Sequence, residues 1–194
     1  MIIYEVRNDS NTFQSFLPKD EAFWSADEHV FDGRPKSRTW LPPEVYSHNP
    51  TKDAGDFWHF GSGTLVATPE CTEVVRDHFE MAGELLPLSY QGLNFTLLNV
   101  LECPDCLDSE KCEWVFGKTS GRPIRINRYA FYRNRLSEST IFKIPFSVRG
   151  MIFTVEGMKD PDDEFKHVVE TSRVLRAHSL RVMAVVGYKE NEVE

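Results

Sequence analysis

The alternation of hydrophobic and polar positions predicts β-strands along much of the chain. Residues 1–7 alternate apolar and polar side chains, which is typical of a strand with one buried face. Other short runs of apolar and β-branched residues predict strands at 64–67, 84–88, 95–101, 124–132, 140–144, 151–155 and 180–188. Because turn residues separate these runs, we expect consecutive strands to pair mostly in hairpin order.

One segment has the spacing and the boundary signals of an amphipathic helix. It begins at Thr68, a capping hydroxyl, which is followed by Pro69 and the acidic Glu70. Gly83 is expected to end it. Its buried face is predicted to hold Cys71, Val74, Val75, His78 and Ala82.

A second helix is predicted to open in the acidic residues 160–164, whose charges favour the positive end of a helix. Its apolar stripe is Phe165, Val168, Val169, Ser172 and Leu175. Two helices, near 68–82 and 162–178, amid about seven strands predict an α+β fold, with a mainly antiparallel sheet and two flanking helices.

Residues 8–56 are rich in Asp, Asn, Ser and Pro and predict no regular element. Single aromatic residues are expected to pin this segment to the core: Phe13, Phe16, Phe23, Trp24, Phe31, Trp40 and Tyr46. We expect one domain over residues 1–194, in which residues 1–56 form an irregular segment and residues 57–194 hold the main sheet and the helices.

Composition favours an ordinary globular protein, because 41% of the residues are apolar and 27% are charged. The longest apolar run is about five residues, whereas a membrane-spanning helix needs about 20. The first residues lack a basic region followed by an apolar stretch, so no secretory signal is expected. These features predict a cytoplasmic protein with reduced thiols at its four cysteines, Cys71, Cys103, Cys106 and Cys112.

Charge is distributed unevenly along the chain. Residues 1–100 hold 7 Lys and Arg against 15 Asp and Glu, so the whole net charge of −8 lies in this half. An acidic half repels nucleic acids and membrane surfaces and attracts basic partners. The second half contains a basic run with no acidic residue inside it, and the simplest interpretation is the solvated face of a strand: Lys118, Arg122, Arg125, Arg128, Arg133 and Arg135.

Three local motifs suggest chemistry, and each is incomplete. Cys103, Cys106 and Cys112 provide three thiols where a structural zinc site needs four ligands, and Cys71 is expected in the core. The sequence Gly-Lys-Thr-Ser at 117–120 lacks the earlier glycine of a phosphate-binding loop and predicts a surface turn. Asp53, Asp56 and His59 lie close together in sequence. They could bind a metal ion, but polar residues of a solvated loop are an equally good interpretation. No catalytic residue, cofactor or metal is assigned.

Several motifs, taken in order, resemble a known family. They are Tyr4-Glu5-Val6, the block from Asp56-Phe57 to Gly61-Ser62-Gly63, residues 83–88, Leu97-Leu98-Asn99-Val100, Asp105-Cys106-Leu107-Asp108, Ile124, Tyr129, Phe131, residues 141–145 and Ile152-Phe153. The chain resembles the Imm-eleven family, formerly a domain of unknown function, over roughly residues 1–155. Each motif is short, and the match depends on their order and spacing.

The resemblance implies an immunity protein of a bacterial polymorphic toxin system, a non-enzymatic protein that binds and neutralises a cognate toxin. A basic nuclease domain is the expected partner, because a nuclease cleft must hold phosphates and an acidic protein can compete for it. The acidic, aromatic-rich first half supplies the candidate partner-binding residues Asp27, Glu28, Asp32, Asp53, Asp56 and Trp58. For Trp58 a place in the core is an equally good interpretation.

Two other functions remain open from the sequence. The basic run over 118–135 could bind nucleic acid, with Tyr129, Phe131 and Tyr132 stacking on bases. A small hydrolase could assemble a site from distant residues, such as His59 with Asp56. The sequence predicts neither the toxin's identity nor the oligomeric state.

Overall fold

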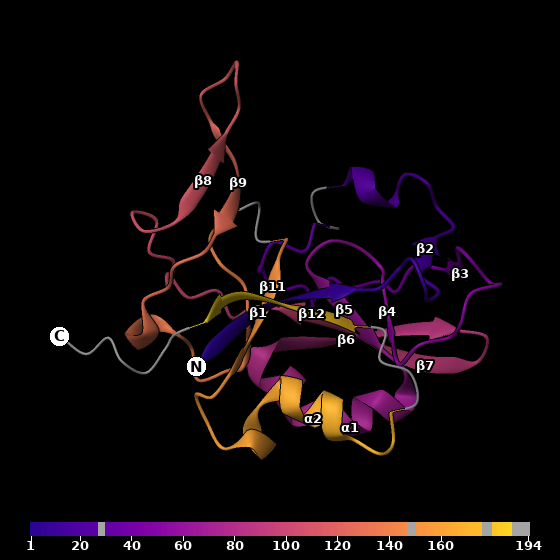
Figure 1. The fold of residues 1–194 in the computed structure, drawn as a ribbon. Coiled ribbons are helices and arrows are strands. Elements are labelled where there is room, and N and C mark those ends of the chain that lie inside the picture. The colour runs from indigo at the N-terminus through magenta and orange to yellow at the C-terminus, as the bar shows by residue number, and fades with distance from the viewer. Residues whose placement is uncertain (27–29, 147–149, 176–179, 188–194) are drawn as a thin grey trace.

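Two four-stranded antiparallel sheets form the frame of the computed structural model, which describes residues 1–26, 30–146, 150–175 and 180–187 (Figure 1). The first sheet has the order β10-β11-β1-β12, with bounds Ile141–Phe142, Ile152–Glu156, Ile2–Asn8 and Leu180–Gly187. The second sheet has the order β4-β5-β7-β6, with bounds Phe57–Trp58, Thr64–Ala67, Leu93–Val100 and Gly83–Tyr90. With helices α1 (Pro69–Ala82) and α2 (Phe165–Thr171), this confirms the predicted α+β class.

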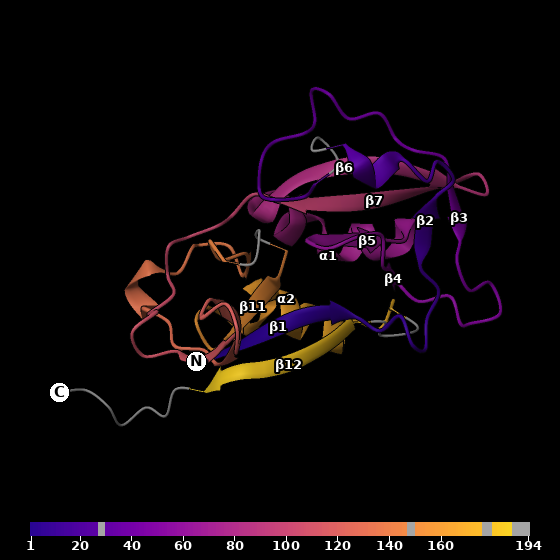
Figure 2. The same cartoon turned by 90° about the horizontal axis from the view of Figure 1, so that it is seen from above.

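The opening strand β1 lies inside the first sheet and pairs antiparallel with both β11 and β12 (Figure 2). Tyr4, for example, lies opposite Thr154 on one side and Ala184 on the other. Residues 2–8 therefore belong to a main sheet, and the irregular part of the N-terminal segment begins after Asn8.

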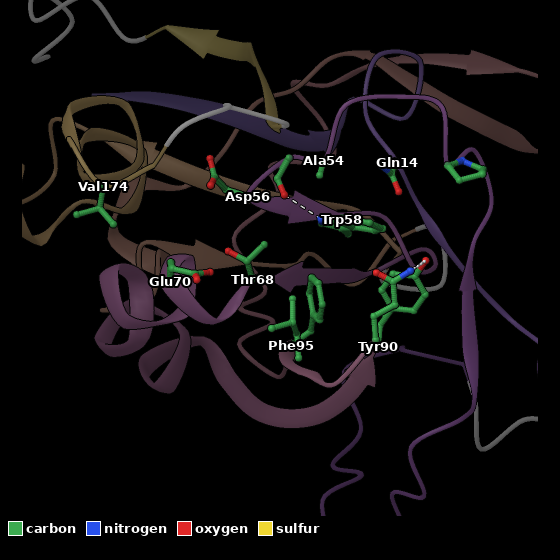
Figure 3. Close-up of a pocket in the computed structure, with 13 residues that line it drawn as sticks. Gln14, Ala54, Asp56, Trp58, Thr68, Glu70, Tyr90, Phe95 and Val174 are labelled. Atoms are coloured by element: carbon green, nitrogen blue, oxygen red, sulfur yellow. Dashed lines mark hydrogen bonds between the residues drawn. The ribbon is translucent and has the colours of Figure 1, made fainter.

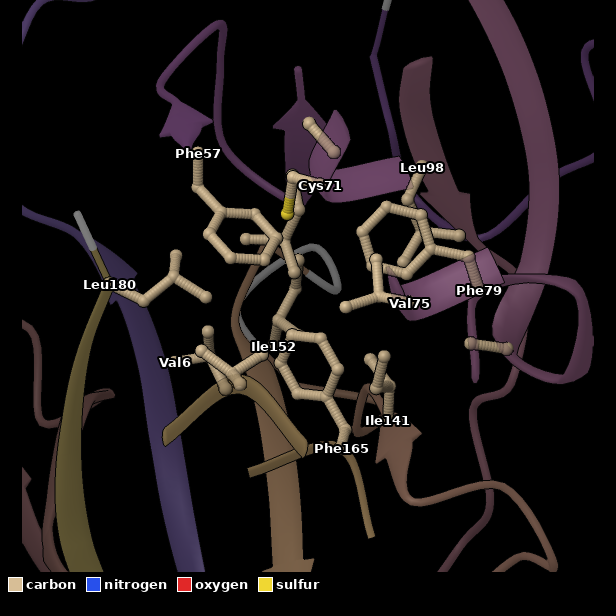
Figure 4. Close-up of a cluster of buried hydrophobic side chains, with 14 of the residues drawn as sticks. Val6, Phe57, Cys71, Val75, Phe79, Leu98, Ile141, Ile152, Phe165 and Leu180 are labelled. Atoms are coloured by element: carbon tan, nitrogen blue, oxygen red, sulfur yellow. The ribbon is translucent and has the colours of Figure 1, made fainter. Parts of the chain in front are cut away.

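The largest buried cluster fills the space between the two sheets and the two helices (Figure 4). Val6 and Ile152 reach it from the first sheet, and Leu98 reaches it from the second. Helix α1 contributes Phe79 and α2 contributes Phe165, whose rings lie 6.1 Å apart. The helices are held by this burial, which is the main source of helix stability in globular proteins.

The other face of the second sheet is covered by the N-terminal segment. Phe16, Phe23 and Phe31 are buried there, as the pinning prediction requires, and Trp40 packs against the same cluster. Trp24 is 38% exposed, but its ring packs 5.0 Å from that of Phe60 in the same cluster. The pinning prediction is wrong for the exposed Tyr46, and Phe13 is half-buried. The segment also contains two short paired strands that the sequence did not predict, β2 (Phe16–Pro18) and β3 (Val45–Ser47).

A third cluster covers the other face of the first sheet. Phe153 of β11 and Ile3 of β1 pack there against Cys106 and Phe131. From this layer the hairpin of β8 (Glu113–Phe116) and β9 (Pro123–Arg128) extends away from the body of the molecule (Figure 1). The sequence predicted a strand over 124–132, but the hairpin ends at Arg128, and β8 was not predicted.

Helix α1 confirms the predicted boundaries. The Thr68 hydroxyl accepts a hydrogen bond from the Cys71 amide at 3.2 Å, and Pro69 occupies the first helical position. The buried face is Cys71, Thr72, Val75, Phe79 and Ala82, and the partly buried Val74 packs against the same cluster. The predicted stripe is therefore correct at four positions and omits Thr72 and Phe79. Gly83 ends the helix and begins β6 directly, without a loop.

Helix α2 is shorter than the predicted 162–178. Residues 161–163 form a 3₁₀ turn, α2 begins at Phe165, and Ser172 is already extended. At its start, the Glu164 side chain does not cap α2, because its carboxylate accepts hydrogen bonds from the backbone amides of Gly157, Met158 and Lys159. This acidic side chain therefore caps the preceding loop, while residues 176–178 lie outside the described residues.

Most predicted strands are confirmed, with small shifts at their ends. The strand 84–88 extends to Gly83–Tyr90 and joins β7 through the turn Gln91-Gly92, where both residues have positive φ. The predicted strand 140–144 shrinks to Ile141–Phe142, and the last strand is confirmed to Gly187, with position 188 outside the described residues.

Candidate functional site

A cavity of about 560 Å³ opens beside the start of α1 (Figure 3). Several parts of the chain build it, including Gln14 of the N-terminal segment and Val174 after α2. The loop before β4 brings Asp56, β4 brings Trp58, and the start of α1 brings Glu70. Tyr90 comes from the end of β6 and Phe95 from β7. The pairings β4–β5, β5–β7 and β6–β7 hold these parts together, so the cavity depends on the second sheet.

One side of the cavity is aromatic. The Trp58 ring stacks on Phe16 at a centroid distance of 4.4 Å and lies 6.0 Å from Tyr90 and 5.6 Å from Phe95. The Trp58 indole N–H donates to the Gly55 carbonyl at 2.8 Å, which fixes the orientation of the ring. In this wall Trp58 and Phe95 are each only 4% exposed, and Tyr90 is half-buried.

The other side is acidic. Asp56 and Glu70 line the cavity on the opposite side of Thr68 from Trp58 and Tyr90 (Figure 3). The Thr68 amide donates to the Asp56 carbonyl at 3.0 Å, which joins the loop before β4 to the first turn of α1. None of the described residues that line the cavity is Lys, Arg or His. The described lining of the cavity therefore combines aromatic side chains with two carboxylates and contains no cationic side chain.

The cavity brings together some of the predicted partner-binding residues. Asp56 and Trp58 line it, and Asp53 is exposed in the loop that leads to it. Trp58 is only 4% exposed and belongs to the core of the second sheet, so the core interpretation holds for this residue. Asp27 and Glu28 lie outside the described residues.

Asp32 lies away from the cavity. It forms an ion pair with Arg34 at 2.8 Å, and the Arg34 carbonyl accepts a hydrogen bond from Asn99, near the end of β7. The cavity adjoins Leu93 at the start of β7, so roughly 20 Å of strand separates the two places. Burial opposes ionisation of Asp32, but hydrogen bonds from Arg34 outweigh it and lower the pKa of Asp32. We therefore assign Asp32 to a local turn.

Sequence reasoning missed Glu70 as a residue of this site, as it missed Tyr90 and Phe95. The Glu70 carboxylate makes no hydrogen bond or ion pair with another described residue, and it is exposed. In the sequence, Glu70 was interpreted only as the acidic residue that favours the positive end of a helix. Only the pairing of β4 with β5 places Asp56 beside this helix start, and that pairing is not readable from local sequence.

The cysteines do not form a reactive or metal-binding cluster. Cys71 is fully buried in the core, as predicted. Burial raises the pKa of Cys106 to about 12, so its thiol is protonated at neutral pH and is a poor nucleophile. The four cysteines form no disulfide, and no group of three His, Cys, Asp or Glu side chains within the described residues could hold a metal ion.

Asp56 and His59 line two different hollows of the structure. Asp56 lines the cavity described above, whereas His59 lines a second hollow beside Gly61 and Arg7. Burial lowers the pKa of His59, which favours the neutral imidazole. The pair proposed for a hydrolase therefore does not converge on one site.

The basic run forms a solvated surface on the β8–β9 hairpin and the segment after it. All six of its cationic residues are exposed, and residues 117–120 form the hairpin turn, as predicted. Tyr129 and Phe131 are buried in the third cluster, and Arg135 covers the Tyr132 ring at 4.3 Å. The three aromatic residues considered for stacking on bases are therefore not presented as a platform.

No protein-family model and no curated protein matches this chain. Within the described residues, none of the helices combines the length and the apolar character that crossing a membrane requires.

Proposed function

We propose that this chain is an immunity protein that binds a bacterial toxin stoichiometrically in the cytoplasm and blocks the toxin's activity. The structural observation that carries the proposal is the acidic, aromatic-walled cavity beside α1, together with Asp53 at its approach. The resemblance of the motif order over residues 1–155 to the Imm-eleven family supports the same function.

The charge of the site favours a toxin with a cationic surface. A nuclease must hold phosphates in a basic cleft, and carboxylates on a partner can occupy that cleft in place of the substrate. The exposed face of α1 extends the negative charge beyond the cavity, because Glu73, Asp77 and Glu80 are all exposed there. A nuclease is therefore the toxin class that fits this surface best.

The test uses the toxin domain encoded beside this gene. Co-expression should restore growth of cells that carry the toxin, and titration of the purified toxin should abolish its activity at one equivalent of this chain. An unrelated nuclease toxin from another locus is the control and should stay active. A toxin that remains active at excess of this chain would refute the proposal, and so would inhibition at far less than one equivalent, which would indicate an enzyme.

The β8–β9 hairpin favours a second candidate, a nucleic-acid-binding module. Its exposed Lys118, Arg122 and Arg125 could contact phosphates without base stacking. A gel shift with mixed single- and double-stranded nucleic acids at about 0.1 M salt tests it. Binding that is lost on Arg122→Glu with Arg125→Glu would support this candidate.

A further inference from the structure

The outer end of the β8–β9 hairpin, residues 116–125, carries exposed apolar side chains among cations. Phe116 is 55% exposed and Ile124 is 62% exposed, and the exposed Pro123 lies opposite Phe116 in the strand pair. We propose that this hairpin end binds the anionic surface of a phospholipid membrane. The inference does not rest on the proposed function and gives the molecule a second interaction surface.

The charge of the hairpin end is entirely positive. Lys118 and Arg122 lie at the turn and Arg125 lies in β9, and all three are exposed. The sequence contains no Asp or Glu from residue 114 to residue 137. Among the described residues, none forms an ion pair with these three cations, whereas Arg128 at the base of the hairpin pairs with Glu113 at 3.1 Å. The three charges are therefore available to an anionic partner.

The apolar side chains of the hairpin end are left in water. On β9, Ile126 is 7% exposed and packs in the third cluster, so the apolar face of this strand is buried at its inner end and exposed at its outer end. A Cβ atom on Gly117 would lie 3.3 Å from the Ile124 side chain, so Ile124 packs against the residue that follows Phe116. Burial of such side chains at the acyl boundary of a membrane removes apolar surface from water.

The layout of the molecule permits this contact despite the net charge of −8. Figure 1 shows the hairpin extending from the body, with its tip at the opposite end of the molecule from α1. The six residues of β9 span about 20 Å, more than twice the Debye length of about 8 Å at physiological ionic strength. The hairpin end therefore reaches an anionic surface while salt screens the repulsion of the exposed acids on α1.

A membrane fits the hairpin end better than a nucleic acid does. Phosphates of either partner can contact the cations, but single strands bind by stacking successive bases on aromatic rings. The hairpin end offers one ring, Phe116, because Tyr129 and Phe131 are buried in the third cluster. The aliphatic Ile124 gains most from acyl chains, which lie directly below the phosphates of a membrane. A projecting hairpin also matches a flat, deformable surface.

Co-sedimentation with vesicles tests the proposal. Phosphatidylcholine vesicles with about 30% phosphatidylglycerol should bind the protein saturably at about 0.1 M salt, and phosphatidylcholine alone should bind it at least about tenfold more weakly. Raising the salt to about 0.5 M should weaken binding to the anionic vesicles about tenfold or more. Equal binding to both vesicles would overturn the recognition of anionic headgroups, and no binding to the anionic vesicles would overturn the whole proposal.

Charge variants locate the contact. Arg122→Gln with Arg125→Gln should weaken binding to the anionic vesicles at least about tenfold, because each cation near such a surface contributes about fivefold. Arg38→Gln with Arg173→Gln is the matched control, because both arginines are exposed, lie outside the hairpin and carry the same total charge. Thermal unfolding of each variant shows whether the fold is retained. Equal weakening by the two pairs would show that net charge, and not the hairpin end, determines binding.

Apolar variants test insertion. Phe116→Ser with Ile124→Thr should weaken binding to the anionic vesicles at least about tenfold, since it removes the side chains that enter the acyl boundary. Met81→Ser with Leu93→Ser is the control, because these side chains are 52% and 53% exposed and lie outside the hairpin. Unchanged binding of the Phe116 and Ile124 variant would overturn insertion of the hairpin end.

A gel shift with mixed nucleic acids decides between the two anionic partners. If the anionic vesicles bind nothing and a gel shift is lost on Arg122→Gln with Arg125→Gln, the hairpin is a nucleic-acid surface and the membrane assignment is wrong. Neutralisation of the neighbouring toxin in solution should be unchanged in both hairpin variants. Failure of vesicle binding therefore leaves the immunity function intact, and failure of toxin neutralisation leaves the membrane contact intact.

Discussion

Glu84 ties the irregular N-terminal segment to the edge of the second sheet. Its carboxylate accepts hydrogen bonds from the amides of Lys36 at 2.7 Å and Ser37 at 3.1 Å, and from the Asn99 side chain at 3.0 Å. Burial alone would raise the pKa of Glu84, but these bonds outweigh it and lower the pKa. The segment thus depends on one ionised side chain as well as on its aromatic anchors.

Glu84→Gln should therefore destabilise the protein by about 1–2 kcal/mol at neutral pH, since three donors lose their charged acceptor. The contribution is complete above the unfolded-state pKa of about 4.3, because the folded-state pKa is lower, and it disappears as the pH falls through the folded-state value. Urea unfolding between pH 7 and pH 3 should show that the difference in the free energy of unfolding between the variant and the wild type becomes smaller as the pH falls. Glu80→Gln, on the exposed face of α1, is the control and should change stability by less than about 0.5 kcal/mol. A difference that stays constant with pH would contradict the role of the charge.

At the scale of single elements, the junction of α1 and β6 is the most constrained position. A Cβ atom on Gly83 would lie 2.0 Å from the Asn99 carbonyl oxygen and 2.8 Å from the Leu101 amide nitrogen. Both are backbone atoms of the neighbouring strand and the residue after it, so they cannot move aside as a flexible side chain could. The glycine is required by this close approach.

Gly83→Ala should consequently cost about 2 kcal/mol or more, because the clash must separate β6 from β7. Gly92→Asn provides the control: Gly92 has a φ of 78° in an open turn, and asparagine tolerates that conformation. The control should cost about 1 kcal/mol or less. Chemical unfolding of both variants measures this, and equal losses would show that strand pairing relaxes around the added methyl group.

The β8–β9 hairpin offers a test of burial within one strand. Ile124 is 62% exposed, whereas Ile126, two residues along, is 7% exposed and packs in the third cluster. Ile126→Thr should destabilise the protein by about 2 kcal/mol, since it removes apolar contacts and buries a hydroxyl. Ile124→Thr should change stability by less than about 0.5 kcal/mol. Thermal melts of the pair check this, and similar losses would mean that the hairpin tip packs against another surface.

The elements that the sequence predicted well are those with strong local signals. Helix α1 has a capping hydroxyl, a proline and an apolar face, and the β6–β7 hairpin has long apolar runs around Gln91-Gly92. The strand pairs β4–β5 and β2–β3 involve two or three residues each, too few for a periodic pattern. Helix α2 was overestimated at both ends, because Glu164 bonds the preceding loop instead of capping the helix and the chain is already extended at Ser172.

The candidate site was predictable only in part, for the same reason. Asp56 and Trp58 were identified from charge and aromatic character, since both are local properties of the sequence. The cavity itself arises where β4, the β6–β7 turn and the start of α1 meet, and only tertiary pairing brings Glu70 to it. Asp32 was proposed on charge alone, and in the structure its carboxylate forms an ion pair with Arg34 away from the cavity.

At the scale of the whole molecule, two opposite electrostatic surfaces are attached to one layered core. The acidic surface comprises the cavity, the loop with Asp53 and the exposed face of α1. The basic surface is the β8–β9 hairpin with its following segment, which extends from the other sheet (Figure 1). A cationic toxin should meet the first surface and be repelled by the second, so charge determines the orientation of encounter.

Charge reversal at Asp53 and Asp56 tests this orientation. Asp53→Lys with Asp56→Lys should slow association with the neighbouring toxin by about tenfold at low ionic strength and flatten the dependence of the on-rate on salt. The Asp56 backbone carbonyl still accepts from Thr68, so circular dichroism should show a retained fold. Lys118→Glu with Arg122→Glu, an equal reversal on the hairpin, is the control and should not slow association. If the acidic-surface variant binds with an unchanged on-rate and the hairpin variant binds more slowly, the toxin docks on the hairpin, and the acidic surface is not the interface.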